Sequence, residues 1–136
     1  MGEILSHPVR DLVTRPPVTV GREATLRQVA HRLWEAEVGI AVVVDDERPV
    51  GVVSERDVVS ALATGADPDA HLACQVMTRH VLAASSTDRV LTAVIDMIDR
   101  GFRHLPVFDD AGRCVGVVSM RELMRPMLLD ALESPA

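Results

Sequence analysis

The chain has 136 residues, the size of one ordinary domain, and 48% of them are hydrophobic, so it is long enough to bury a core. A formal net charge of −6, with one Trp, two Phe and no Tyr, argues against nucleic acid as a partner. No apolar run approaches the ~20 residues of a membrane helix and no signal-peptide pattern opens the chain, so we expect a cytoplasmic protein that needs no membrane.

The first predicted elements alternate between the strand and helix periods. Residues 17–20 (PVTV) are a short β-branched run, which predicts a strand. From Leu26 to Leu33, apolar residues fall at i, i+3, i+4 and i+7, which predicts an amphipathic helix. Thr25 and Gln28 form a capping-box pattern at the start of that helix.

Two strands and a second helix are expected next. Residues 40–46 (IAVVVDD) and 49–54 (PVGVVS) are almost continuously apolar, as in strands buried on both faces. A hairpin-sized loop joins them, and a helix follows Ser54. In Ser54-x-x-Asp57 the serine can accept the N–H three residues on, and the acid can reach back.

The second part of the chain repeats this order. The stretch GVVSERD (51–57) recurs as GVVSMRE (116–122), and other segments match at an offset of 64. The pattern places repeat 1 at 9–64, a linker at 65–72, repeat 2 at 73–126 and a C-terminal tail at 127–136.

Each repeat is predicted to run strand-helix-strand-strand-helix, which gives an α/β (α+β) fold class. One repeat is too small to be stable alone, so we expect two repeats related by a pseudo-twofold axis. Pro126 is predicted to end or kink the last helix near Arg125.

The repeated strand ending has two interpretations. Helix capping by itself explains Ser54 with Asp57 and Ser119 with Glu122. Alternatively the motif is a ligand site, because Gly51 would leave the backbone uncovered and a helix N-terminus attracts anions. An aspartate at that place can accept both hydroxyls of a ribose.

Together these features resemble the CBS domain, named after cystathionine β-synthase, in the tandem arrangement called a Bateman module. The family's Gly-hydrophobic-x-Ser/Thr-x-x-Asp ending is met in full by Gly51, Val52, Ser54 and Asp57. The Met-Thr before the first strand is matched at 77–78, and the His-x-Pro-Val strand start at 104–107. The resemblance implies a stand-alone, non-enzymatic sensor whose regulatory ligand is AMP, ADP, ATP or S-adenosylmethionine.

The resemblance also implies two unequal clefts. The first has an aspartate and a basic pair, and its expected residues are Val53, Ser54, Asp57, Thr78, Ala83, Arg103, His104, Leu105 and Pro106. The second, weaker cleft has a longer acid and no basic pair, and its expected residues are Thr14, Val18, Gly39, Ile40, Ala41, Ser119 and Glu122. We expect one tight nucleotide per chain in the first cleft, and Glu122 to be engaged as the capping partner of Ser119.

Output is expected to pass through a homodimer or an unidentified effector protein. The helical residues predicted for a dimer surface are Leu26, Trp34, Val58, Leu62, Leu123, Leu128 and Leu129. Two alternatives stay open: a ligand-free structural dimerisation module, and a redox-responsive protein that uses Cys74 and Cys114. For these cysteines, the favoured interpretation is two buried thiols that act as small hydrophobic residues. No cluster has metal-ligand spacing and no nucleophile has a recognisable base, so neither a metal site nor catalysis is expected.

Overall fold

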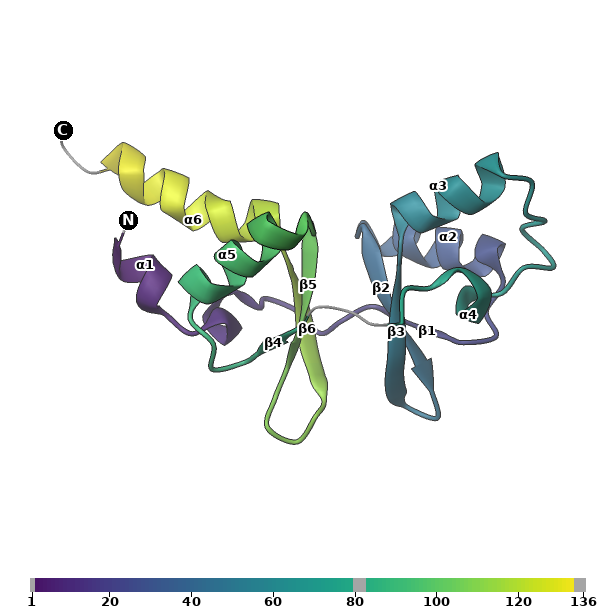
Figure 1. The fold of residues 1–136 in the computed structure, drawn as a ribbon, viewed down its shortest axis with the longest axis horizontal. Coiled ribbons are helices and arrows are strands. Elements are labelled where there is room, and N and C mark those ends of the chain that lie inside the picture. Colours follow the sequence, from purple (N-terminus) through teal and green to yellow (C-terminus); the bar gives the residue numbers. More distant parts are fainter. Residues whose placement is uncertain (1, 80–82, 134–136) are drawn as a thin grey trace. The chain divides into compact units, whose positions relative to one another are not determined.

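The structure, a computed structural model, describes residues 2–79 and 83–133 (Figure 1). The chain divides into two compact units, of which unit 1 comprises residues 1–16 and 82–136, and unit 2 comprises residues 17–81. The units therefore do not coincide with the sequence repeats. The first 16 residues pack with the elements of the second repeat. The segment that leads into the second repeat packs with the elements of the first repeat.

Unit 2 contains a three-stranded sheet with helices packed on it. Its elements are β1 (Thr19–Gly21), α2 (Leu26–Ala36), β2 (Ile40–Asp45), β3 (Arg48–Ser54), α3 (Glu55–Ala63) and α4 (Ala73–Val76). The strand order is β1-β2-β3, with β1 parallel and β3 antiparallel to β2. Valines of the three strands pack against α2 and α3 to form the core of the unit.

Unit 1 repeats this plan with a different set of helix lengths. Its elements are α1 (Gly2–Ser6), a 3-10 turn (Val9–Leu12), β4 (Ala84–Ser85), α5 (Val90–Arg100), β5 (His104–Phe108), β6 (Cys114–Ser119) and α6 (Met120–Glu133). The order β4-β5-β6 again joins a parallel pair to an antiparallel pair. The predicted α+β fold class and the order of strands and helices are confirmed.

The exchange of chain segments between the repeats has a local cause in each unit. In unit 1, Val9 is fully buried in the core, and its N–H donates to the carbonyl of Asp88 at 2.7 Å. In unit 2, Ala73 takes the equivalent place and donates to Ala24 at 2.7 Å. Each segment thus adds an apolar side chain and backbone hydrogen bonds to a unit whose other elements lie elsewhere in the sequence.

Pro126 does not end the last helix, because α6 continues to Glu133. Proline removes the helical hydrogen bond to the carbonyl four residues earlier, which here belongs to Glu122. Glu122 is exposed, so water can satisfy that carbonyl. Residues 127–133, expected to begin a tail, are therefore helical.

The dimer-surface prediction is wrong for three residues, because the side chains of Leu26, Val58 and Leu123 are only 0%, 6% and 0% exposed. They lie on the buried faces of their amphipathic helices, and the last two belong to the cores of their units. The other four are exposed: Trp34, Leu62, Leu128 and Leu129.

Candidate functional site

In unit 2, the strand ends gather residues that were expected in both clefts. Ile40 lies opposite Ser54, and Ala41 lies opposite Val53, in the antiparallel pair β2-β3. The N–H of Glu55, the first residue of α3, donates to the carbonyl of Gly39 at 2.9 Å. One end of this sheet therefore carries the start of β2, the end of β3 and the N-terminus of α3.

Thr78 lies beside the same strand end. It forms an isolated antiparallel bridge with Val52, with N–H to carbonyl distances of 3.0 and 2.9 Å in the two directions. Since Val52 precedes Ser54 by two residues, unit 2 brings together four expected members of the first cleft. These are Val53, Ser54, Asp57 and Thr78.

Gly51 serves this chain crossing, so the hypothesis that it uncovers the backbone for a ligand is wrong. A Cβ at Gly51 would lie 2.6 Å from the carbonyl oxygen of Thr78 and 2.9 Å from the Sδ of Met77. Unit 1 repeats the arrangement, with Val13 and the carbonyl of Arg15 against Gly116. The glycine is required because another segment of the protein already covers the strand there.

We expect Gly51→Ala to lower the free energy of unfolding by about 1–3 kcal/mol, the usual cost of overpacking. The added methyl group must displace backbone at Thr78, which cannot move as a side-chain tip can. Gly21→Ala is the matched control, because nothing lies within 4 Å of its Cβ position. Urea denaturation measures both, and equal stability of the two variants would contradict the packing role.

The carboxylate of Asp57 is held in place by a complete capping box. Its backbone N–H donates to Ser54 Oγ at 3.1 Å, and the N–H of Ser54 donates to Asp57 Oδ2 at 2.8 Å. The second carboxylate oxygen, Oδ1, makes no hydrogen bond within the part of the chain that the structure describes. A half-buried carboxylate is therefore fixed with one oxygen available to a hydroxyl donor.

The expectation that Glu122 is the better capping partner is wrong. Its N–H donates to Ser119 Oγ at 3.1 Å, but within residues 83–133 its carboxylate accepts no hydrogen bond in return. The longer glutamate side chain is exposed and loses more rotamer freedom on closing the ring than aspartate does. The box is thus closed in unit 2 and half-formed in unit 1.

Unit 1 places the expected basic pair at the start of β5. His104 lies opposite Ser119, and the carbonyl of Arg103 accepts the N–H of Met120, the first residue of α6, at 2.9 Å. Leu105 and Pro106 follow in the buried part of β5. Arg103 is exposed and His104 half-buried, so the guanidinium is accessible to an anion.

The remaining expected residues also fall into one unit or the other. Thr14 and Ala83 belong to unit 1, while Val18, which accepts the N–H of Val42 at 2.8 Å, belongs to unit 2. Each expected cleft therefore draws on both units. The structure brings together the half contributed by each unit, and the assembly of complete clefts stays a prediction.

The family model for the CBS domain matches residues 9–64 and 73–128. The chain belongs to the CBS domain family. Its tandem organisation, inferred from the duplicated strand endings, is thereby confirmed as a CBS pair.

Solved CBS structures share this fold. A CBS domain protein from Pyrobaculum aerophilum, complexed with AMP, is 36% identical, with a TM-score of 0.82, over 93% of this chain and 99% of that one. The CBS domain pair of protein MJ0100, complexed with 5′-methylthioadenosine and S-adenosyl-L-methionine, is 26% identical with a TM-score of 0.80, over 90% and 97% of the two chains. An uncharacterized protein of Methanopyrus kandleri is 31% identical over 94% of this chain and 67% of its own length.

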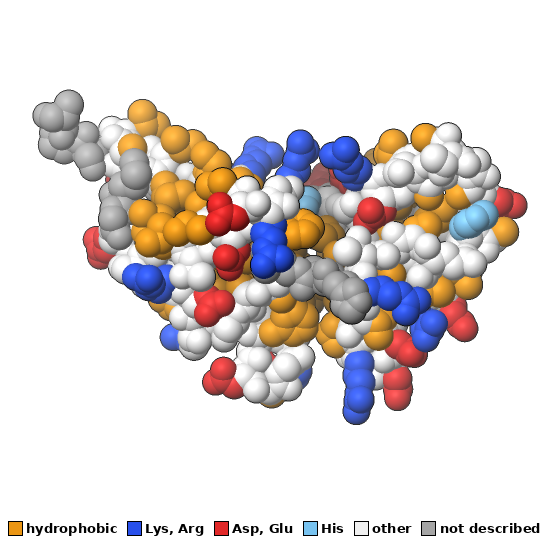
Figure 2. All heavy atoms as spheres, in the orientation of Figure 1, with side chains coloured by type: hydrophobic (Ala, Val, Ile, Leu, Met, Phe, Trp, Pro, Cys, Tyr) orange, Lys and Arg blue, Asp and Glu red, His pale blue; other side chains and the backbone are white. Residues whose placement is uncertain are grey.

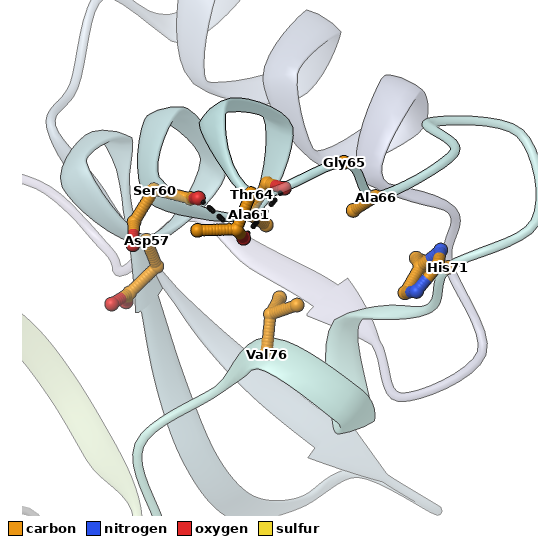
Figure 3. A pocket seen from close by; sticks show the side chains of 8 residues that line it. All are labelled: Asp57, Ser60, Ala61, Thr64, Gly65, Ala66, His71 and Val76. Atoms are coloured by element: carbon orange, nitrogen blue, oxygen red, sulfur yellow. Dashed lines mark hydrogen bonds between the residues drawn. The ribbon is translucent and has the colours of Figure 1, made fainter.

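The first CBS repeat also carries a hollow that sequence reasoning missed (Figure 3). Its volume is about 380 Å³, and all of its lining residues belong to unit 2: Asp57, Ser60, Ala61, Thr64, Gly65, Ala66, His71 and Val76. The sequence feature that could have indicated this hollow is the Thr64-Gly65 pair, which predicts that α3 ends there. Asp57 stands at one end of this hollow and His71 at the other.

The two cysteines of the CBS pair are free thiols that lie in different units. Burial raises the pKa of the Cys114 thiol above its usual value, and Cys114 Sγ donates to the carbonyl of Gly116 at 3.4 Å. A raised pKa lowers the thiolate fraction at neutral pH, which disfavours oxidation at this residue. Cys114 therefore has the character of an inert core thiol.

Within residues 2–79 and 83–133, no group of three or more His, Cys, Asp or Glu residues could hold a metal ion. Among the helices of these same residues, none is long and apolar enough to span a bilayer.

Proposed function

We propose that this CBS pair is a regulatory module that binds an adenine nucleotide or S-adenosylmethionine in the cleft that contains Asp57. The observation that carries the proposal is the Asp57 carboxylate, which the capping box with Ser54 fixes and whose Oδ1 makes no hydrogen bond to residues 2–79 or 83–133. The complexes of similar CBS structures with AMP and with S-adenosyl-L-methionine support this choice of ligand class.

The proposed roles follow from the chemistry of each side chain. Asp57 Oδ1 accepts hydrogen bonds from the ribose hydroxyls, as carboxylates do in dinucleotide-binding folds. Arg103 and His104 of unit 1 contact the phosphoryl oxygens, for which the planar guanidinium is well suited. Ala83, which is exposed, supplies apolar contact to the base.

The second cleft is proposed to bind nucleotide weakly. Gly39 and Ile40 stand where the first cleft has Arg103 and His104, so no fixed positive charge offsets a phosphate there. Glu122 remains able to accept a hydroxyl, but its carboxylate is not held by a cap and must be ordered on binding. We therefore propose one tight ligand per chain.

A thermal-shift screen with AMP, ADP, ATP, S-adenosylmethionine and NAD tests the proposed function. A ligand that binds only the folded state raises Tm in a concentration-dependent way. Titration calorimetry on the best ligand then gives the stoichiometry. If none of the five ligands shifts Tm, the alternative of a ligand-free structural module replaces this proposal.

The module is proposed to be regulatory rather than catalytic, and to signal through a homodimer. On α6 an exposed apolar stripe runs along Met124, Leu128 and Leu132, which are 43%, 58% and 82% exposed (Figure 2). Antiparallel pairing of α6 with its copy about Leu128 would set Met124 of one molecule against Leu132 of the other and bury this stripe.

Leu128→Glu is therefore expected to convert the dimer to monomer, because it puts a charge at the centre of an isologous contact. Sedimentation velocity measures the mass of the wild type and of this variant. Val59→Glu on α3 is the matched control, since Val59 is equally open at 64% exposure and lies in unit 2. A wild-type chain that sediments as a monomer at all concentrations would rule out this interface.

A further inference from the structure

The hollow of unit 2 is bounded on one side by the end of α3, which is closed by hydrogen bonds. Thr64 Oγ1 donates to the carbonyls of Ser60 and Ala61 at 2.9 and 3.1 Å. Gly65, with φ +97°, turns the chain, and the N–H of Ala66 then donates back to Ala61 at 2.9 Å. This wall is formed before any ligand arrives.

His71, at the opposite end of the hollow, belongs to a segment, residues 67–71, that is hydrogen-bonded to itself and to α2. The N–H of Asp67 donates to His71 Nδ1 at 3.1 Å, and the Nε and Nη2 of Arg27 donate to Asp69 at 2.6 and 3.1 Å. The hydrogen bond from Arg27 lowers the pKa of Asp69, so this pair stays ionised at neutral pH. A site with fixed walls binds without the entropic cost of ordering a loop.

The hollow exists because the first repeat ends its helix early. At the offset of 65, Thr64 and Gly65 correspond to Leu129 and Asp130 of the second repeat. Those two residues lie inside α6, which continues to Glu133, whereas α3 stops at Ala63. Half of its lining, Gly65, Ala66, His71 and Val76, lies beyond the first repeat, so the hollow arises where α3 ends and the linker begins, and the duplicated fold does not require it.

The lining of the hollow is rich in hydrogen-bond acceptors. Thr64 uses its hydroxyl proton on backbone carbonyls, so its lone pairs remain for a donor, and the Ser60 hydroxyl can also accept. Asp57 is the only carboxylate among the lining residues, and His71 accepts the N–H of Asp67 at Nδ1. The C-terminal end of α3 adds partial negative charge.

The Asp57 carboxylate and the negative end of α3 disfavour an anion and favour a cation in the hollow. The size and apolarity of the lining indicate which kind of cation fits. Ala61, Ala66 and Val76 are small and apolar, so they can cover methylene groups. A volume of about 380 Å³ is far larger than a bare metal ion needs and lies in the range of small-molecule sites. No Trp, Tyr or Phe stands among the eight lining residues, which argues against a quaternary ammonium group.

We propose that the hollow of unit 2 is a binding site for a small aliphatic amine. The ammonium group lies among Asp57, Ser60 and Thr64, and the carbon chain lies against the alanines and Val76. This proposal shares Asp57 with the nucleotide proposal and otherwise rests on residues of unit 2 that the nucleotide proposal does not use, so titration with AMP is needed to separate the two.

The test titrates the whole ¹⁵N-labelled chain with putrescine and with two probes of the same carbon number, butanediol and succinate. Putrescine is expected to shift the amide signals of Thr64, Gly65 and Ala66 saturably, and to bind at least about tenfold more tightly than either probe. High salt is expected to weaken putrescine binding, since the hollow is open to solvent. No saturable shift with putrescine, or equal binding of butanediol, would overturn the proposal.

A filled hollow provides the second arm of the test. Ala66→Leu is expected to weaken putrescine binding by at least about tenfold, and Ala131→Leu at the matching repeat position is expected to leave it unchanged. Unchanged binding in the folded Ala66→Leu variant overturns the proposal. Titrating both variants with AMP separates the two functions, since AMP binding that persists while putrescine binding is lost supports two distinct sites.

Discussion

Asp57→Ala is expected to weaken nucleotide binding by about 1.5–3 kcal/mol, which is roughly ten- to hundredfold, the usual loss for hydrogen bonds to a charged group. The variant removes the carboxylate that the capping box of α3 holds in place, whose second oxygen makes no hydrogen bond among the described residues. Titration calorimetry with the ligand selected by the thermal-shift screen measures the effect.

The same substitution also opens the capping box, which costs about 0.5–2 kcal/mol of folding stability. Thr25→Ala is a suitable stability control, because it removes the Oγ1 acceptor that caps α2 in the same unit and leaves Ser54 and Asp57 unchanged. Glu122→Ala is the matched control in the second repeat and is expected to leave the affinity almost unchanged. Wild-type affinity in Asp57→Ala, or a greater loss in Glu122→Ala, would show that the clefts are ranked wrongly.

Arg103→Ala is expected to weaken ATP binding by about tenfold and adenosine binding by less than about twofold, because the contacts proposed for the guanidinium are with phosphoryl oxygens only. Arg103 is exposed, so the effect on ATP is also expected to shrink at high ionic strength. Competition titration with the two ligands at low and high salt measures the difference.

Arg100→Ala is the matched control for this experiment, since Arg100 is another exposed arginine of unit 1, at the end of α5. If both variants lose the same affinity for ATP, the effect belongs to the net charge of the chain and not to a contact at Arg103. Equal losses for ATP and adenosine in Arg103→Ala would exclude a role in phosphate binding.

The sequence by itself determined the elements that depend on local spacing. The alternation of apolar runs with 3.6-residue periods predicted the strands and helices of both repeats, because burial of one face needs only the residues of that segment. The Ser54-x-x-Asp57 spacing predicted the capping box for a similar reason, since both of its hydrogen bonds join residues three positions apart. The duplication, together with the motif residues, was enough to indicate the family.

The sequence could not predict the features that depend on which segments meet. Gly51 looked like a place for a ligand, yet Thr78, from beyond the linker, covers it. Leu26 and Leu123 looked available for a dimer because an apolar residue on a helix does not show whether its own unit already buries it. Glu122 matched the preferred capping residue, but its rotamer leaves the carboxylate unbonded.

Only the tertiary structure decided that residues 1–16 pack with the second repeat and that the end of α3 encloses a hollow. Both depend on backbone hydrogen bonds between residues that are distant or irregularly spaced, such as Val9 with Asp88 and Leu26 with His71. Such bonds form because buried N–H groups must find an acceptor in the folded chain, and neither hydrophobic periodicity nor motif spacing specifies which acceptor is near.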